Sequence, residues 1–212
     1  AMGTRKYEGS KWGGKYMRAP DIYWHIVEKC RENLVTLGSV SEIRRGVTTG
    51  ANDFFFLDEE TKDYWEIEDE YLVPLINSFR KIRRLKYTQN SQLLYCHKSK
   101  SELAGTGVLR YIQHGESENY HLRSSVQNRS PNWYSLKITE PDFLLPRFWD
   151  KRFWTPIPKS SGVYCSDTFM FGKSKTAAGV LNILLNTSFH FLQLEINGRV
   201  NQGAGVLATY GI

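Results

Sequence analysis

The stretch Ile43-Arg44-Arg45-Gly46-Val47-Thr48-Thr49-Gly50-Ala51-Asn52-Asp53-Phe54-Phe55-Phe56-Leu57 is the most informative part of this chain. Residues 38–45 alternate between apolar and polar side chains, which predicts a strand. A polar loop bounded by Gly46 and Gly50 follows, and the apolar run at residues 54–57 predicts a second, buried strand. We expect both glycines to have structural roles, with a positive φ at Gly50, and Asn52 to close a side-chain turn.

The rest of the chain mixes helical and strand patterns without regular alternation. The expected helices cover residues 20–33, 68–76, 101–114 and 176–195. The expected strands cover residues 92–96, 133–136, 143–145 and 168–171. This order predicts the α+β class, with a mixed, sheet-rich domain and several flanking helices.

Bulk composition limits the kind of protein further. The chain has 212 residues, of which 41% are hydrophobic and 14% aromatic, enough to bury a core. No apolar run approaches the roughly 20 residues that span a bilayer, so no membrane partner is expected. Cys30, Cys96 and Cys165 are odd in number and far apart, which indicates reduced thiols in a cytoplasmic protein.

Charge is distributed unevenly along the chain, whose net charge is +6. Residues 58–70 contain eight acids and one base, a local charge of −7. Residues 71–101 contain no acid, and their basic residues are Arg80, Lys81, Arg83, Arg84, Lys86, Lys98 and Lys100. A stretch of one sign favours a polyanionic partner such as nucleic acid. The alternatives are an ordinary solvated face and internal pairing with the acids of residues 58–70.

Catalytic patterns are missing from the sequence. Gly105-Thr106-Gly107 lies in a helix-like pattern and does not follow an apolar strand, so we do not expect a cofactor loop there. The Asn/Asp-Pro-Pro-aromatic tetrapeptide that holds a flipped adenine for methylation is missing, because no Pro-Pro occurs. Pro141-Asp142 is not followed by the Glu-x-Lys triplet of a metal-dependent nuclease. The five histidines lack zinc-ligand spacing. We therefore expect no catalytic residue, no cofactor and no metal site in this chain.

Residues 46–57 closely resemble the G-x-x-T-G-x-N-x-F-F-x-L signature of TaqI-like specificity domains. These domains follow the catalytic domain in N6-adenine DNA methyltransferases and in fused restriction–modification enzymes. Further similar stretches occur in the family's order, at residues 16–20, 70–76, 109–112, 184–188 and 198–200. The resemblance covers nearly the whole chain from residue 16 onward.

The resemblance implies a DNA target-recognition domain at residues 20–212, with residues 1–19 as tag and linker. It implies two partners, double-stranded DNA in the bacterial cytoplasm and an N-terminal methyltransferase domain in the same longer chain. It also places S-adenosylmethionine and its methyl transfer in that catalytic domain, which this fragment lacks.

Candidate DNA contacts fall into two groups. Cations that neutralise phosphates give affinity that does not depend on sequence, and the candidates are Lys81, Arg83, Arg84, Lys86, Lys98 and Lys100. Polar side chains that reach base edges give specificity, and the candidates are Arg44, Arg45, Asn52, Gln127, Asn128, Arg129 and Arg152. We expect the isolated chain to bind duplex DNA weakly and without sequence preference. The 48–52 loop could also approach the DNA backbone through its amides.

Three alternatives remain open at this point. The chain could be half of a type I restriction specificity subunit, although the long heptad-patterned helices of those subunits are missing. It could be a nuclease or transferase with an unfamiliar site, which a cluster of carboxylates would favour. It could also be an interaction domain whose basic face docks an acidic protein.

Overall fold

The computed structural model describes residues 14–89, 91–149, 154–200 and 207–208. It confirms the α+β class, with one mixed sheet, further antiparallel and parallel strand pairings, and flanking helices. The helices are α1 (Gly14–Arg18), α2 (Asp21–Lys29), α3 (Leu37–Val40), α4 (Asn52–Phe55), α5 (Glu59–Trp65), α6 (Gly107–Ser117), α7 (Ala178–Leu184) and α8 (Ser188–Asn197). Short 3₁₀ turns are η1 (Arg31–Asn33), η2 (Asp69–Tyr71), η3 (Phe79–Lys81) and η4 (Tyr120–Leu122). Among the described residues, no helix is both long and apolar enough to cross a membrane.

Two sheets form the body of the molecule. The strands are β1 (Ser41–Arg45), β2 (Phe56–Leu57), β3 (Leu72–Ile76), β4 (Lys86–Tyr87), β5 (Ser91–Leu94), β6 (Phe143–Pro146), β7 (Phe148–Trp149), β8 (Ile157–Pro158), β9 (Tyr164–Cys165), β10 (Phe169–Ser174), β11 (Arg199–Val200) and β12 (Leu207–Ala208). The β10 sheet is antiparallel with the order β1-β10-β6. The β5 sheet has the order β2-β5-β3-β9, in which only β9 is parallel to its neighbour. Smaller pairings join β4 to β8, and β12 to β11 and β7.

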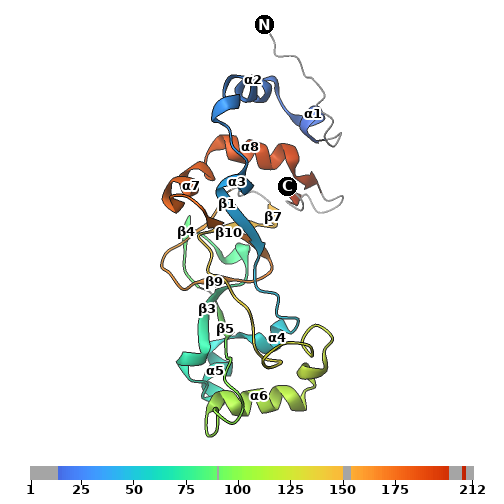
Figure 1. The fold of residues 1–212 in the computed structure, drawn as a ribbon, viewed down its shortest axis with the longest axis vertical. Helices are drawn as coiled ribbons and strands as arrows, with labels where there is room; N and C mark the ends of the chain where they lie inside the picture. The colour runs from blue at the N-terminus through green and yellow to red at the C-terminus, as the bar shows by residue number, and fades with distance from the viewer. Residues whose placement is uncertain (1–13, 90, 150–153, 201–206, 209–212) are drawn as a thin grey trace.

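The molecule is elongated, as Figure 1 shows. Helices α1, α2 and α8 lie toward one end, the β10 sheet lies in the middle, and the β5 sheet with α6 lies at the other end. The chain passes between these two sheets four times. We call the passage after β1 the first crossing and the passage between β9 and β10 the second crossing. Val47 at the first crossing pairs with Ser166 at the second, so the two crossings lie side by side.

Alternating side chains on the β10 sheet fill two separate cores. Phe143 and Leu145 on β6 face one side and pack with Leu181 and Leu185 from the α7 region. Leu144, between them in sequence, faces the other side, in a cluster with residues of β3, β4, β9 and β10. Because side chains alternate between the two faces along β6, α7 packs on one face of this sheet.

Aromatic rings dominate the core between the β5 sheet and α6. Phe54 stacks on Tyr111 of α6 at 4.7 Å between ring centroids, and it also contacts Trp133. The Tyr111 hydroxyl donates a hydrogen bond of 2.8 Å to the Phe54 carbonyl. Because Phe54 directly follows the first crossing, this packing fixes where the crossing loop ends.

The helical end contains part of the stretch expected as linker. Residues 14–18 form α1, and residues 1–13 lie outside the described residues. Ala19 and Tyr23 pack with Ile196 of α8. Arg18 donates to the carbonyls of Glu195 and Gly198 at the end of α8, where a cation complements the helix dipole.

Two strand and helix predictions near the β5 sheet are wrong. Residues 54–57 form a helical turn, α4, before the two-residue strand β2, because an apolar run this short fits both periods. Residues 68–76 form a 3₁₀ turn and strand β3 in place of the predicted helix. Pro74 lacks the N–H that a helix interior needs, and β3 instead pairs with β5 and β9.

Two further predictions differ from the structure in part. Residues 133–136 make no strand ladder, and side-chain hydrogen bonds hold them, such as Tyr134 Oη to the Lys98 carbonyl at 2.7 Å. The expected helix at residues 176–195 is two helices, α7 and α8. The Asn186 side chain between them bonds both the N–H and the carbonyl of Thr155, which explains the break.

Candidate nucleic-acid interface

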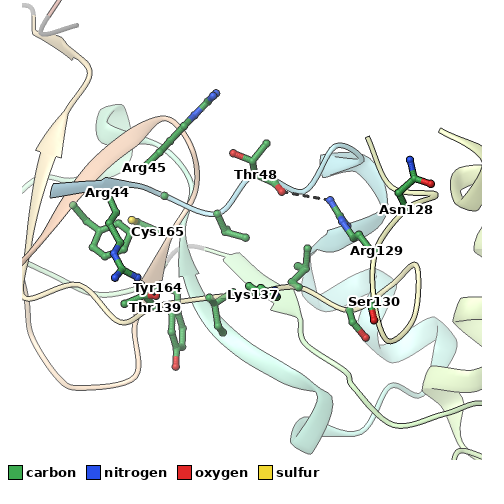
Figure 2. A pocket seen from close by; sticks show the side chains of 16 residues that line it. Arg44, Arg45, Thr48, Asn128, Arg129, Ser130, Lys137, Thr139, Tyr164 and Cys165 are labelled. Atoms are coloured by element: carbon green, nitrogen blue, oxygen red, sulfur yellow. Dashed lines mark hydrogen bonds between the residues drawn. The ribbon is translucent and has the colours of Figure 1, made fainter. Parts of the chain in front are cut away.

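A groove of about 620 Å³ opens where the first and second crossings meet. Its walls come from β1 and the loop after it, from residues 128–130, from residues 135–139 and from β9. Figure 2 shows Arg45 and Thr48 on one side of the β1 segment, and Arg44 turned to the other side toward Thr139. Four of the seven expected base contacts line this groove: Arg44, Arg45, Asn128 and Arg129. They come from segments about 80 residues apart in sequence.

The other three candidates stand elsewhere. Asn52 is exposed, and its amide oxygen accepts a hydrogen bond from the Thr49 hydroxyl, so it closes a turn within the crossing loop. Gln127 is exposed next to Asn128 but does not line the groove. Arg152 lies outside the described residues. The base-reading role of all seven stays a prediction.

The crossing loop after β1 has the backbone features that were predicted for it. Gly50 has a φ of +66°, which confirms the expected positive φ. At Gly46, a Cβ would stand 2.0 Å from the Ser166 carbonyl oxygen, so only glycine permits the two crossings to approach. The Thr49 side chain accepts a hydrogen bond of 3.1 Å from the Ala51 N–H and is fully buried. The loop is thus a rigid part of the groove wall.

Arg129 joins the crossing loop to the 118–132 segment. Its Nη2 donates to the carbonyls of Thr48 and Thr49, and its guanidinium lies 5.2 Å from the Phe55 ring centroid. Its Nη1 is buried and has no hydrogen-bond partner among the described residues. Burial lowers the pKa of Arg129. The Arg129 side chain therefore supports the groove by linking the crossing loop to the 118–132 segment, and its Nη1 group is shielded from solvent.

A second tie holds the 118–132 segment from its other end. Arg123 binds the Asp53 carboxylate through both Nη atoms at 3.0 Å, and the Tyr120 hydroxyl donates to the same carboxylate at 3.0 Å. The hydrogen bond from Arg123 is the main cause that lowers the pKa of Asp53. Asn128 is placed at the groove by a segment that is anchored at both Arg123 and Arg129.

The expected phosphate contacts Lys81, Arg83, Arg84 and Lys86 lie with Arg80 in an exposed cationic segment. Ile82 and Tyr87 are buried in the core under the β10 sheet, so they anchor the backbone on both sides of residues 83–86. The exposed cations are Arg80, Lys81, Arg83, Arg84 and Lys86, and none of them makes an ion pair or side-chain hydrogen bond with a described residue. We call these five the basic segment.

The basic segment starts beside the second crossing. The Asn77 carbonyl accepts hydrogen bonds from the hydroxyls of Ser166 and Thr168, at 3.3 and 3.1 Å. Phe79 then packs edge-on against Phe169, whose carbonyl accepts from the Gly46 N–H. The turn at residues 166–169 therefore connects the groove wall directly to the start of the basic segment.

Lys98 and Lys100 are placed differently from the other phosphate candidates. Lys98 binds Glu70 at 3.2 Å and the Tyr71 hydroxyl at 3.0 Å, and Lys100 binds Glu116 at 2.5 Å. Hydrogen bonds from Tyr71 and Lys98 lower the pKa of Glu70. For Lys98 the alternative of pairing within the acidic stretch therefore holds, and both lysines sit by the β5 sheet, apart from the basic segment.

The acidic residues 58–70 are largely used in local structure near α5 and α6. The Asp58 side chain caps α5 by accepting from the Thr61 N–H at 2.9 Å. Glu68 accepts from the N–H groups of Gly107 and Val108 at 2.8 and 3.2 Å, at the start of α6. Glu66 pairs with Arg110. The charge asymmetry in sequence thus becomes an asymmetry in space, with these acids held around the β5-sheet end.

Three lining residues were not expected from the sequence. Lys137 and Thr139 follow the irregular 133–136 segment and border the groove, and Lys137 is an exposed cation with no ion pair among the described residues. Ser130, next to Arg129, also lines it. Their only sequence signal is polarity within a turn-rich stretch, which is common to many loops.

The structure also places the residues considered for other chemistry. Within the described part of the chain, no group of three or more His, Cys, Asp or Glu side chains is arranged to hold a metal ion. Asp142 accepts hydrogen bonds from Lys173 and from the Ser174 N–H, both at 2.7 Å. At Gly107 a Cβ would stand 2.0 Å from the Glu66 carbonyl oxygen, which gives this glycine a packing role.

Comparison with known proteins places this architecture. Residues 10–210 match the model of the C-terminal domain of Type II methyltransferase M.Eco57I. The chain belongs to this family. The resemblance to C-terminal domains of restriction–modification methyltransferases is thereby confirmed.

Individual relatives agree with this membership. Type II methyltransferase M.AccI of Acinetobacter calcoaceticus is 27% identical over 141 residues, which cover 62% of this chain and 24% of that protein. The type IIG restriction endonuclease BpuSI has a similar structure, with a TM-score of 0.56 at 16% identity, covering 82% of this chain and 23% of that one. The type IIL restriction–modification enzyme MmeI gives 0.54 at 18% identity, covering 72% and 21%. The chain thus spans about a quarter of the length of these relatives.

Proposed function

We propose that this chain is the part of a restriction–modification DNA methyltransferase that binds double-stranded DNA and recognises its target sequence. In this proposal the groove at the sheet crossings contacts base edges, and the basic segment contacts phosphates. Methyl transfer and S-adenosylmethionine binding belong to a methyltransferase domain in the same protein, in the bacterial cytoplasm. The proposal concerns adenine-specific methylation, as the resemblance of residues 46–57 implies.

One observation carries this proposal. Side chains able to hydrogen-bond bases, from segments about 80 residues apart, converge on a single groove. The turn at residues 166–169 links its wall to the start of the basic segment, whose five exposed cations are unpaired among the described residues. Phosphate contacts position a protein on DNA, whereas base contacts specify the sequence, so a reader needs both sets next to each other. MmeI, whose structure was determined in complex with DNA, shares the fold.

The charge distribution supports a DNA-binding role for the basic segment. Clustered cations without internal partners can release counterions when they meet phosphates, which gives affinity that weakens steeply as salt rises. Lys98 and Lys100 are already paired, so we now expect them to contribute less than the basic segment. An interaction domain for an acidic protein would use the same cations, but shape-matched protein contacts would make its binding less sensitive to salt.

The test uses the isolated chain and a duplex of arbitrary sequence. We expect a dissociation constant of roughly 1–100 µM near physiological salt, the range of non-specific binding. Reversing Arg83 and Arg84 together to glutamate should weaken binding to all sequences alike. It should also reduce the slope of log affinity against log salt by about 2, one for each lost phosphate contact. Fluorescence anisotropy over a salt series measures both quantities.

A matched control carries the same change of net charge at the helical end. Lys29 and Arg31 are exposed cations near the end of α2, and reversing both to glutamate should leave the salt slope within error of the parent chain. Equal losses for the two double variants would show that only net charge matters. An unchanged affinity after reversing Arg83 and Arg84 would remove the basic segment from the DNA face.

A further inference from the structure

Arg44 and Arg45, neighbours at the end of β1, use their guanidinium groups differently. Arg44 binds the Glu42 carboxylate through Nε at 2.9 Å and Nη2 at 2.8 Å, while its Nη1 reaches Thr139 Oγ1 at 3.5 Å. Arg45 binds Asp167 through Nη2 alone, at 2.7 Å. Its Nε and Nη1 make no hydrogen bond with a described residue, and its side chain is 52% exposed. Arg45 therefore keeps four of its five N–H donors for a ligand, whereas Arg44 has three in use.

The direction of the two side chains follows from the strand. Successive residues of β1 point to opposite faces, and Figure 2 shows Arg44 turned toward Thr139 while Arg45 extends outward on the side of Thr48. Arg44 therefore ties β1 to the opposite groove wall. Arg45 stands at the open edge of the groove.

Asp167, the partner of Arg45, is fixed by its backbone. Its N–H donates to the Val47 carbonyl at 3.0 Å, and its own carbonyl accepts from Arg147 Nη1 at 2.8 Å. The Phe169 N–H closes the turn by donating to the Ser166 carbonyl at 3.1 Å. The carboxylate is 24% exposed, about half the value of Arg45. A carboxylate on so constrained a turn can hold the guanidinium in one orientation.

Guanine is the base that fits such a group. Its major-groove edge presents two acceptors, N7 and O6, and an arginine that donates to both makes the commonest specific contact between proteins and DNA. Two parallel hydrogen bonds need a guanidinium of fixed plane, and each fork pairs one Nη2 hydrogen with a hydrogen of Nη1 or of Nε. Asp167 takes one Nη2 hydrogen and fixes the plane, which leaves the other fork open. A phosphate can accept the same two bonds but carries no sequence information, so a change of sequence preference in Arg45 variants separates the two contacts.

We propose that Arg45, positioned by Asp167, reads a guanine and so determines one base pair of the recognised site. This inference rests on the proposed function and adds which residue reads which base. Arg45 is the specificity-determining residue, Asp167 is its positioning residue, and Arg44 holds the groove wall.

The experiment uses the full-length protein that carries this chain and a pool of duplex DNA with randomised sequence. Retained duplexes are sequenced for the parent protein and for Arg45→Ala, Arg45→Lys and Asp167→Asn. Arg83→Ala is the control, because it removes the same charge from the basic segment. Circular dichroism melting verifies that each variant is folded.

The parent protein should retain a defined sequence that contains guanine. Arg45→Ala should lose the preference for guanine at one position by on the order of 10- to 100-fold, with the other positions unchanged. Arg45→Lys should lose it as well, although the charge is kept, and Asp167→Asn should weaken the same position. Arg83→Ala should bind more weakly while selecting the parent sequence.

Three outcomes overturn the inference in whole or in part, and they are distinguishable. If Arg45→Ala and Arg45→Lys select the parent sequence at every position, Arg45 reads no base, although the proposed function stands. If the parent protein retains duplexes without any preferred sequence, the proposed function fails and this inference fails with it. A preference retained by Arg45→Lys and lost by Arg45→Ala would reduce the role of Arg45 to its charge.

Discussion

At the scale of single residues, Gly46 determines whether the groove can form. Its position lies between β1 and the crossing loop, where the backbone of residues 165–166 passes at contact distance. The Gly46 N–H donates to the Phe169 carbonyl, and the Val47 N–H to the Cys165 carbonyl. A side chain at this position would push apart backbone segments that both line the groove. The obstacle is a carbonyl group, which cannot move aside as a flexible side chain can.

Gly46→Ala should therefore lower the free energy of unfolding by about 3 kcal/mol, at the upper end of the usual cost of overpacking. Gly179→Ala is the matched control, since a Cβ at Gly179 in α7 meets no atom within 4 Å. In a helix that exchange should raise stability by roughly 0.5–1 kcal/mol. Urea denaturation of the two variants measures both. If the two substitutions changed the free energy of unfolding equally, the close backbone approach at Gly46 would not contribute to stability.

Residue-level chemistry was predictable from sequence where it depends on near neighbours. Glycine at residue 50 and the Thr49–Asn52 side-chain turn follow from local backbone preferences. The partner of Arg45 was not predictable, because Asp167 lies 122 residues away and meets it only after β10 pairs with β1. Lys137 was missed for a different reason, because its segment has no regular helix or strand period.

At the scale of elements, the groove depends on how the 118–132 segment is held. This segment contains only the short turn η4, so side chains must fix it. Asp53 at the start of α4 binds both Arg123 and Tyr120, and Arg123 also lies 4.3 Å from the Tyr120 ring centroid. Near the other end, Arg129 bonds the crossing loop. Two anchors on residues 48–53 thus position Asn128.

The Asp53 anchor should depend on pH. The hydrogen bond from Arg123 lowers the pKa of Asp53 in the folded chain below its ordinary value near 4. A carboxyl group whose pKa is depressed by folding contributes stability above the unfolded pKa and loses it as pH falls through the folded pKa. Asp53→Asn should therefore reduce amide-exchange protection of residues 118–126 at pH 7, and the difference from the parent chain should shrink as pH falls below 4.

Hydrogen exchange followed by mass spectrometry measures this protection segment by segment. Residues 21–29, which form α2, serve as an internal reference, because α2 packs with α8 at the other end of the molecule. A loss of protection that is equal in α2 and in the 118–126 segment would mean that Asp53→Asn destabilises the whole fold. A difference that persists unchanged at pH 2 would contradict the ionic character of the anchor.

Element prediction succeeded only in part. The helical pattern predicted α2, but the helix predicted at residues 101–114 begins only at Gly107. Alternation predicted β1, although residues 38–40 belong to α3, and short apolar runs predicted β5, β6 and the first part of β10. The prediction failed at residues 54–57 and 68–76, because apolar runs of four or five residues satisfy both helix and strand periods. Tertiary pairing then decides: β3 lies between β5 and β9 although it contains Pro74.

At the scale of the whole molecule, charge and shape are organised along one long axis. The acids of residues 58–70 lie around α5 and α6 at one end, and the basic segment lies by the β10 sheet in the middle. The sheet crossings between them contain the groove. Such a separation leaves a cationic middle region, which can attract a polyanion while the acidic end repels it. The bulk charge in the sequence predicted a polyanionic partner, but only the fold shows which cations remain unpaired.

The most direct measurement asks whether duplex DNA lies against the groove. A photo-crosslinking amino acid replaces Lys137 at the groove or, as the control, Tyr64 of α5, which is 77% exposed among the acidic residues. The account predicts cross-links to duplex DNA from position 137 that disappear at high salt, and none above background from position 64. Cross-links from position 64 with none from position 137 would contradict it.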